Sequence, residues 1–188
     1  MPRNYKPLLQ QEFINGIYKI VPIRDEDKYA IMQWRNEQID ILRQKEPLTK
    51  EKQECYFNNV IDKLFEQEKP NQLLFSFLEN DILIGYGGLV HIDWESKNAE
   101  ISFITITDRN KDETTFSKDF ESYLLIIFEI AYRFLDFNKL HTTFYDIPER
   151  NSYQMVLERL NFSREAHLKS HLFFNDRFVD VFIYSHFR

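Results

Sequence analysis

Apolar positions in the first part of the chain follow the period of a strand and then that of helices. Alternation over Ile17–Ile23 predicts a strand that stops at a charged segment. Spacings of three and four over Tyr29–Arg43 predict a helix, and the same spacing after Thr49, a candidate N-cap, predicts a second helix. This part is therefore expected to fold as a strand followed by two helices.

The middle of the chain changes to short apolar runs separated by turn residues. Gln72–Trp94 is predicted to form two strands that turn at Glu79–Asp81, because Asn and Asp tolerate turn geometry. A further strand is predicted over Lys97–Thr107. A long amphipathic helix is predicted to begin near Thr115, since apolar residues recur every three or four positions as far as Phe134.

The last part of the chain predicts four more elements. They are a strand over Leu140–Ile147, a helix over Ser152–Leu160, and two strands within His171–Ser185 that join through Asn175–Asp176. The complete order is β, α, α, β, β, β, α, β, α, β, β, without an internal repeat. We therefore expect an α/β (α+β) fold in a single domain over residues 1–188.

Composition narrows the functional classes. The chain has 188 residues and a formal charge of −6, and this acidic balance argues against a general nucleic-acid binder. Tyr123–Phe128 is the most apolar run and is too short to cross a bilayer, so no membrane partner is expected. Cys55 is the only cysteine, which excludes an internal disulfide and fits a reducing cytoplasm. His167, His171 and His186 lack the spacing of metal ligands, so no metal is expected.

Three of the four glycines fall in the segment GYGGL at Gly85–Leu89. The segment lacks the spaced Lys-Ser/Thr pair of a phosphate loop, and it lies inside a predicted strand. A bulge or the close approach of another backbone explains glycines at such a position. We therefore expect these glycines to serve the sheet rather than a ligand.

Several segments resemble the GNAT family of acyltransferases, as does the order of elements. WRNEQI at Trp34–Ile39 and LTKEKQECYF at Leu48–Phe57 resemble the acceptor-side helices of its ribosomal-protein and nucleotide-amino-sugar acetyltransferase branches. ILIGYGGLVHIDWESKNAEISF at Ile82–Phe103 and the stretch Val156–Ser185 resemble the same branches. The resemblance covers residues 17–187 and implies the GNAT fold, a central mixed and mostly antiparallel sheet flanked by helices.

The stretch TITDRNKDETTFSKDF at Thr105–Phe120 departs from the pattern of this family. The resemblance implies a glycine-rich loop there, whose amides hold the pyrophosphate of coenzyme A at a helix N-terminus. This stretch has no glycine and is rich in acidic residues. A looser site is expected to use cations, hydroxyls and the first helical turn, with Arg109, Lys111, Thr114, Thr115 and Phe116 as candidates. The alternative is a solvated loop with an ordinary helix cap.

The resemblance also implies where the rest of the co-substrate lies. An acyl-CoA, carrying an acetyl group or a longer one, would lie in a split between two strands beside Phe103, Ile104 and Thr105, whose side chains are framework. Arg150 and Asn151, just before the short helix, are candidates to contact the pantetheine or phosphate arm. No metal is implied.

Acyl transfer to an amine needs a base for the amine and a proton donor for the leaving thiolate. Glu100 and His91, both in the predicted central strands, are the candidates for the base, and Asp93 is a third. Tyr153 lies near the position where the family presents a hydroxyl to the cofactor sulfur. The alternative for each is a structural role, as a hydrogen-bonded strand residue or as an aromatic ring that packs the short helix.

Arg35 and Asn36 are candidates to bind the acceptor, because Arg presents a planar fork of donors that matches phosphate oxygens. An ion pair between Arg35 and Glu37 or Asp40 is the alternative. Asp93 and Trp94 are further candidates for acceptor contacts. In these branches the resemblance implies a small-molecule amine, most prominently a nucleotide-linked amino sugar used in surface-polysaccharide synthesis.

Two other functions remain open. One is N-terminal acetylation of a protein, for which an acid-lined groove is expected. The other is a GNAT-like interaction module that has lost coenzyme binding, which the glycine-free stretch would explain. For any of the three we expect a homodimer, because the closing hairpin within His171–Ser185 is aromatic on both faces.

Overall fold

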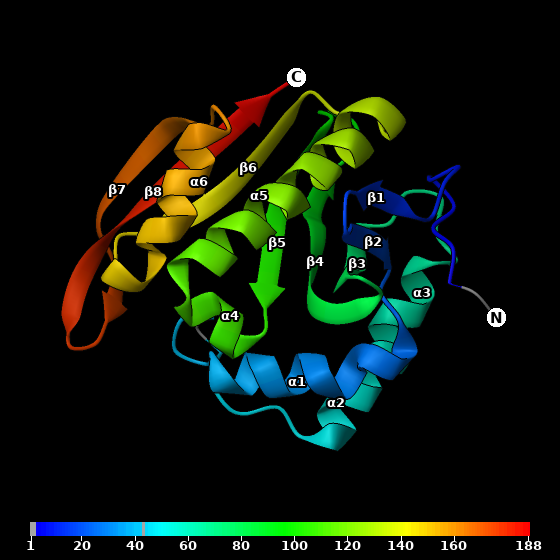
Figure 1. Ribbon diagram of the computed structural model, residues 1–188, viewed down its shortest axis with the longest axis horizontal. Coiled ribbons are helices and arrows are strands. Elements are labelled where there is room, and N and C mark those ends of the chain that lie inside the picture. The colour runs from blue at the N-terminus through cyan, green and yellow to red at the C-terminus, as the bar shows by residue number, and fades with distance from the viewer. Residues whose placement is uncertain (1–2, 43) are drawn as a thin grey trace.

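The computed structural model describes residues 3–42 and 44–188, and these form an eight-stranded sheet with helices against it (Figure 1). The strand order is β1-β2-β3-β4-β5-β6-β8-β7. All neighbouring strands are antiparallel except β5 and β6, which are parallel. The strands are β1 Phe13–Asn15, β2 Tyr18–Pro22, β3 Leu73–Glu79, β4 Ile82–Asp93, β5 Asn98–Thr105, β6 Lys139–Tyr145, β7 Ser163–Phe174 and β8 Arg177–Phe187.

The helices divide between the two faces of the sheet. Figure 1 shows α5 and α6 crossing the front of the sheet, and α1 and α2 lying together at its lower end. No helix of the described residues is both long enough and apolar enough to traverse a bilayer. The helices are α1 Lys28–Glu37, α2 Lys50–Tyr56, α3 Asp62–Leu64, α4 Thr107–Lys111, α5 Glu113–Phe128 and α6 Asn151–Arg159, with π-helical turns at Phe57–Ile61 and Glu129–Phe134 and 3-10 turns at Asp25–Asp27 and Pro148–Arg150.

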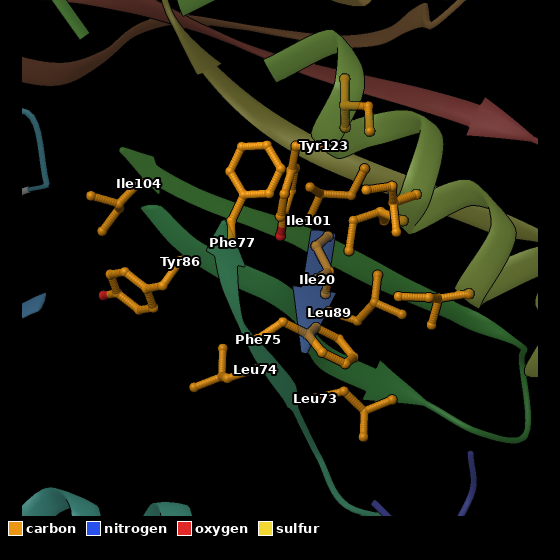
Figure 2. Close-up of a cluster of buried hydrophobic side chains, with 14 of the residues drawn as sticks. Ile20, Leu73, Leu74, Phe75, Phe77, Tyr86, Leu89, Ile101, Ile104 and Tyr123 are labelled. Carbon is orange, nitrogen blue, oxygen red and sulfur yellow. The ribbon is translucent and has the colours of Figure 1, made fainter. Parts of the chain in front are cut away.

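Strand alternation sends the buried side chains to both faces (Figure 2). Phe77 and Phe103 face α5, where their rings lie 5.4 and 4.5 Å from that of Tyr123. Leu74 and Tyr86 point the other way, toward α1 and α2. Because both faces of the central strands are covered, β3 is buried along all but its last residue and β4 is buried over its central part, Ile84–Leu89.

Most of the predicted elements are confirmed. The two middle strands turn where predicted, with Asn80 and Asp81 in the left-handed region at φ 48° and 67°. Thr49 caps α2, because its side chain accepts a hydrogen bond from the amide of Lys52. The predicted helix over residues 29–43 is too long: it ends at Glu37, residues 38–42 form turns, and residue 43 lies outside the described residues. Strand β1 was not predicted, since three residues are too few to show a period.

The stretch between β5 and α5 contains a short helix that was not predicted, α4. The long helix also begins earlier than predicted, at Glu113. Asp112 is its N-cap, because the carboxylate of Asp112 accepts a hydrogen bond of 2.7 Å from the amide of Thr115. Asp is as good an N-cap as Thr, so the sequence pattern alone did not choose between the two positions.

The glycines of β4 allow close approach of neighbouring backbones, as predicted. A Cβ at Gly87 would lie 2.1 Å from the carbonyl oxygen of Ser102 and 2.6 Å from the hydroxyl of Tyr123. Gly88 has φ +155°, and a Cβ there would lie 1.8 Å from the carbonyl oxygen of Leu73. Any side chain at either position would therefore push adjacent strands apart.

Candidate active site

Helices α1 and α2 and strands β4 and β5 enclose a cavity of about 610 Å³, here called the acceptor cavity. Its lining combines apolar side chains with amides, hydroxyls, one arginine and one histidine, and it includes no carboxylate. Such a lining suits a polar ligand that does not carry several positive charges. The lining residues are Ile23, Ile31, Arg35, Leu48, Gln53, Tyr56, Phe57, Asn71, Gln72, Leu74, Tyr86, Val90, His91 and Ser102.

Arg35 lines the acceptor cavity from α1 and is held there by two hydrogen bonds. Its Nη1 donates to the hydroxyl of Tyr86 at 2.8 Å, and its Nε donates to Oε1 of Gln44 at 3.2 Å. Burial raises the pKa of the Tyr86 hydroxyl, and the nearby guanidinium opposes that rise. The alternative ion pair with Glu37 or Asp40 is not formed among the described residues. The guanidinium therefore keeps its charge and several donors for a ligand.

Asn36 has a structural role instead of the predicted acceptor contact. Its Nδ2 donates to the carbonyl of Leu48, and its Oδ1 accepts from the amide of Leu48 at 2.7 Å. Oδ1 also accepts from Nε2 of Gln44. Asn36 thus uses both ends of its amide to fix the segment after α1, the same segment that orients Arg35 through Gln44.

Asp93 and Trp94, predicted as acceptor contacts, use their side chains in contacts within the fold. The carboxylate of Asp93 accepts hydrogen bonds from the amide and hydroxyl of Ser96, so it closes the turn between β4 and β5. Trp94 donates from Nε1 to the carbonyl of Pro70 at 2.8 Å and packs its ring edge-on against Phe137. Both side chains are committed to the fold.

The two principal candidates for the base lie against each other. Nδ1 of His91 is 2.7 Å from Oε2 of Glu100, and Oγ1 of Thr143 donates to Oε1 of Glu100 at 3.4 Å. The side chain of Glu100 is 25% exposed, whereas that of His91 is 79% exposed. His141 on β6 lies close enough to interact with Glu100. Burial lowers the pKa of the His141 imidazole, and this effect is larger than the opposing effect of the Glu100 carboxylate.

Strands β5 and β6 separate immediately beyond Glu100. Their pairing covers only Asn98–Glu100 with Lys139–His141, so the second half of β5 leaves its β6-facing edge unpaired. The framework residues of that half are well fixed: Phe103 stacks on Phe120 at 5.1 Å, and Oγ1 of Thr105 donates to the carbonyl of Ile84. This is the geometry that the resemblance implied, a split in the sheet beside Phe103, Ile104 and Thr105.

Tyr153 lies in the same region from the α6 side. Its hydroxyl is 2.5 Å from Oγ1 of Thr142, and its ring stacks on Phe120 at 4.4 Å. Burial raises the pKa of the Tyr153 hydroxyl. Because Thr142 and Thr143 are successive residues of a strand, they point to opposite faces of β6. The Tyr153 hydroxyl and the Glu100 carboxylate therefore lie on opposite sides of the sheet at the start of the split.

Arg109 does not take the predicted place beside a phosphate. Its Nε and Nη2 donate to the two oxygens of Asp119 at 2.6 and 2.7 Å, and its Nη1 donates to Oε2 of Glu79 at 3.1 Å. Asp119 is fully buried and also accepts from the hydroxyl of Tyr18. These carboxylates raise the pKa of Arg109. The guanidinium joins α5 to the sheet, so we correct its expected role from cofactor binding to structural support.

The N-terminal turn of α5 borders two adjoining cavities, which share Glu113 and Ser152. One has a volume of about 400 Å³ and is lined by Lys111 and Phe116 among others. The second has a volume of about 510 Å³, follows the groove between α5 and α6, and is lined by Thr114. The amide of Thr115 is already used by the helix cap. Lys111, Thr114 and Phe116 are thus positioned beside space, while Thr115 is not free to donate from its amide.

Arg150, in the 3-10 turn just before α6, carries a buried donor without a partner in the described residues. Its Nε is buried and makes no hydrogen bond within the described residues, although buried N–H groups are nearly always paired. Its guanidinium lies 4.1 Å from the ring centre of Tyr153, which leaves the edge of the group for an oxygen. An anionic or amide oxygen of the co-substrate would satisfy this donor. Asn151 is exposed at the first residue of α6.

Several cavity residues were not predicted. Tyr56, Gln72, Tyr86 and Ser102 line the acceptor cavity, and Tyr86 holds Arg35. One feature of the sequence could have identified Tyr86. It lies between Gly85 and Gly87 in a strand, so its side chain is on the face of the sheet opposite the one toward which those two positions are directed. Among residues 3–42 and 44–188, no group of three or more His, Cys, Asp or Glu side chains is arranged to hold a metal ion.

Several solved structures with a similar fold are described as acetyltransferases. A probable acetyltransferase superposes with a TM-score of 0.72 at 18% identity, over 94% of this chain and 97% of that one. A spermidine N-acetyltransferase from Vibrio cholerae in complex with CoA and spermine gives 0.71 at 18% identity, over 92% and 96%. A ribosomal-protein-S5-alanine acetyltransferase from Vibrio fischeri gives 0.68 at 14% identity, over 95% and 97%. At these identities the likeness shows the fold alone.

The sequence itself matches a family profile. No curated protein is similar enough to count as a match, but the profile described as Acetyltransferase (GNAT) domain matches residues 20–183. This match confirms the family resemblance and the predicted fold class. Acetyl-CoA is the co-substrate of this family, and transfer of its acyl group to an amine is the family reaction. Because the match spans most of the sequence, the chain belongs to the GNAT acetyltransferase family.

Proposed function

We propose that this enzyme transfers an acyl group, acetyl or slightly longer, from acyl-CoA to the amino group of a nucleotide-linked amino sugar. The observation that carries this proposal is the acceptor cavity, which is lined by aromatic rings, amides and Arg35, whose guanidinium bonds only to neutral groups, and by no carboxylate. Its volume of about 610 Å³ lies within the range for small-molecule sites, about 300–1,000 Å³.

Two other classes of acceptor fit this lining less well. A polyamine carries several ammonium groups, which bind best to carboxylates, and a charge left without a partner in such a site is costly. A protein N-terminus was expected to need an acid-lined groove. The one fixed charge of the cavity has the opposite sign, since Arg35 is a cation. A phosphate-bearing acceptor is therefore favoured over both.

Each part of such an acceptor has a proposed contact. Arg35 presents its remaining donors to the diphosphate. Tyr56 provides a ring on which the nucleobase stacks. This residue is 40% exposed, and its hydroxyl accepts a hydrogen bond of 3.5 Å from Nε2 of Gln72. The sugar amine then lies toward His91 and Glu100, where β5 and β6 separate. Tyr153 donates to the thioester sulfur as it leaves.

The experiment is a CoA-release assay over three panels of amines: nucleoside diphosphate amino sugars, polyamines, and peptides with free N-termini. Turnover confined to the first panel is expected. Arg35→Met should raise KM for the amino sugar about tenfold or more, because hydrogen bonds to charged groups contribute about 1.5–3 kcal/mol, and should leave KM for acetyl-CoA unchanged. Arg133→Met is the control, since Arg133 lies on the surface beside Glu129.

Other outcomes would replace the proposal. Turnover only with polyamines or peptides would show that the charge of the cavity does not select the acceptor. Absence of turnover with every amine, together with no binding of acetyl-CoA by calorimetry, would favour the interaction module without catalysis.

We also propose a homodimer built on the closing hairpin. Strand β7 is one edge of the sheet, and Phe173 and Phe178 on this hairpin are 59% and 67% exposed with their rings 5.1 Å apart. Exposed aromatic pairs at a sheet edge favour association. Light scattering should give the mass of a dimer, and Phe173→Ser with Phe178→Ser should give a monomer. The exposed, unpaired Cys55 is in keeping with a cytoplasmic enzyme.

A further inference from the structure

His91 has an unusual backbone conformation for a residue inside a strand. Its φ is +49°, in the left-handed region. Most other residues with positive φ lie in turns or at a helix end, and many of them are Asn or Asp; Ser170 is the other one within a strand. A residue held in this region stores strain of roughly 1–3 kcal/mol, and such residues concentrate at functional sites.

The strained residue sits in a β-bulge that changes the direction of its side chain. The pairing of β4 with β5 shifts between Val90 and Asp93. In a regular strand His91 would point to the face opposite Val90, but both residues line the acceptor cavity. The bulge therefore brings His91 to the same face as Glu100, with which Val90 is paired. Bulges beside active sites have this effect on a side chain.

The contact with Glu100 fixes which ring nitrogen of His91 is free. A carboxylate only accepts hydrogen bonds, so Nδ1 of His91 carries the hydrogen and donates to Oε2 of Glu100 across 2.7 Å. Nε2 is then the nitrogen with a lone pair. Glu100 itself is occupied at both oxygens, by His91 and more weakly by Thr143. Of the two side chains, His91 is the more exposed one and reaches the cavity and solvent.

We propose that Nε2 of His91 is the general base and that Glu100 is a positioning residue that holds the imidazole in the reactive tautomer. This division of roles rests on the proposed acyl transfer. Nε2 takes one proton from the acceptor amine as the nitrogen bonds to the thioester carbonyl carbon. The carbon–sulfur bond then breaks, the thiolate takes a proton from the Tyr153 hydroxyl, and His91 and Tyr153 regain their starting states by exchange with water. The products are the amide and free CoA.

The charges around His91 agree with this assignment. Glu100 on β5 is its direct partner, His141 on β6 lies beyond Glu100 and has its pKa lowered by burial, and Arg35 faces the same cavity from α1. One carboxylate is thus in contact with the ring, while burial favours the neutral form of His141. An imidazolium formed during the reaction has a partner at Nδ1.

The test uses variants that keep the bulge. His91→Asn retains a residue type that tolerates positive φ and retains a donor toward Glu100, but it has no base. Its kcat/KM should fall on the order of 10²–10⁴-fold with an unchanged thermal midpoint. His91→Gly, which suits positive φ best, should regain activity when imidazole is added. His171→Asn on the exposed closing hairpin is the matched control and should behave as the wild type.

Glu100 is tested by the separate effects of its substitution on kcat and on KM. Glu100→Gln should lower kcat roughly tenfold or more, since the ring is no longer held in one tautomer, and should leave KM for acetyl-CoA unchanged. Glu100→Asp should recover part of the rate, and Glu95→Gln in the exposed turn is the control.

The outcomes separate this inference from the proposed function. A wild type that is active on an amine, with a His91→Asn variant that keeps its turnover and its acid limb, would overturn the role of His91 alone. A Glu100→Gln variant with a lost rate, beside an active His91→Asn, would make Glu100 the base instead. A wild type without activity on any amine would instead refute the acyl transfer itself.

Discussion

Replacing Arg109 should cost the protein stability rather than coenzyme affinity. Arg109 lies in the stretch where the sequence placed the phosphates, but its guanidinium makes two hydrogen bonds of 2.6 and 2.7 Å to Asp119. Asp119 has no exposed surface, and its remaining contact is a hydrogen bond from Tyr18. In Arg109→Met the carboxylate would stay buried without its cation, because Asp119 is fixed on α5 beneath the sheet.

The expected loss follows from the burial of Asp119. Removing one partner of a buried ion pair costs about 3–5 kcal/mol, because the other charge is left uncompensated, and the whole stability of a domain is about 5–15 kcal/mol. At roughly 2–4 °C per kcal/mol for a protein of this size, the thermal midpoint should fall by roughly 6–20 °C. Removing both partners in Arg109→Met with Asp119→Leu should recover much of this loss, since no unpaired buried charge remains.

Urea unfolding followed by circular dichroism gives the free energies, and calorimetry gives the Kd for acetyl-CoA. Arg133→Met on the surface is the control, expected within about 0.5 kcal/mol of the wild type. An Arg109→Met protein with normal stability and weakened acetyl-CoA binding would refute this reasoning. It would return Arg109 to the cofactor site.

Three other changes have expected outcomes. Arg150→Met should raise the Kd for acetyl-CoA about tenfold or more in calorimetry, because methionine removes the buried Nε donor that we propose binds the co-substrate. Gly87→Ala should lower the free energy of unfolding by about 1–3 kcal/mol or more in urea titrations, since the new Cβ would meet the carbonyl of Ser102 at 2.1 Å. Burial lowers the pKa of His186 in the folded protein below its ordinary value of 6.5. As the pH falls, the imidazole is therefore protonated in the unfolded chain before it is protonated in the folded protein. The free energy of unfolding should fall as the pH drops below 6.5, until the lower pKa of the folded state is passed. His186→Phe, which can still stack on Phe128, should flatten that fall.

The order of strands and helices could be predicted because its signals are local. Short apolar runs between turn residues mark β3 and β4, the turn at Asn80–Asp81 uses residues that accept positive φ, and Thr49 is a cap that needs only the amide three residues on. The boundaries of α1 and α5 could not be predicted as well. The helix α1 ends where Gln38 reaches the carbonyl of Thr105 on a distant strand, a contact with no local trace in the sequence.

The candidate site was predictable only in its residue types. His91 and Glu100 were recognised as possible bases, but alternation along a regular strand would point His91 to the face opposite Val90. Only the bulge brings His91 to Glu100. Arg35 and Asn36 are neighbours in sequence with equal claims on an acceptor, and they separate because Asn36 is used to hold the backbone of Leu48. Such choices depend on partners that the fold supplies.

The acidic residues in α5 and just before it are a weaker objection to coenzyme binding than the sequence indicates. Asp119 is neutralised inside the protein by Arg109, and Glu121 pairs with Arg159 at 2.7 Å. The carboxylate of Asp112 accepts a hydrogen bond from the amide of Thr115 and so caps α5. These three acidic residues therefore have partners that reduce their repulsion of a phosphate. Arg150, in the 3-10 turn just before α6, has a buried donor without a partner in the described residues, so we propose that a cation from a different part of the chain takes the place of the glycine amides of other family members.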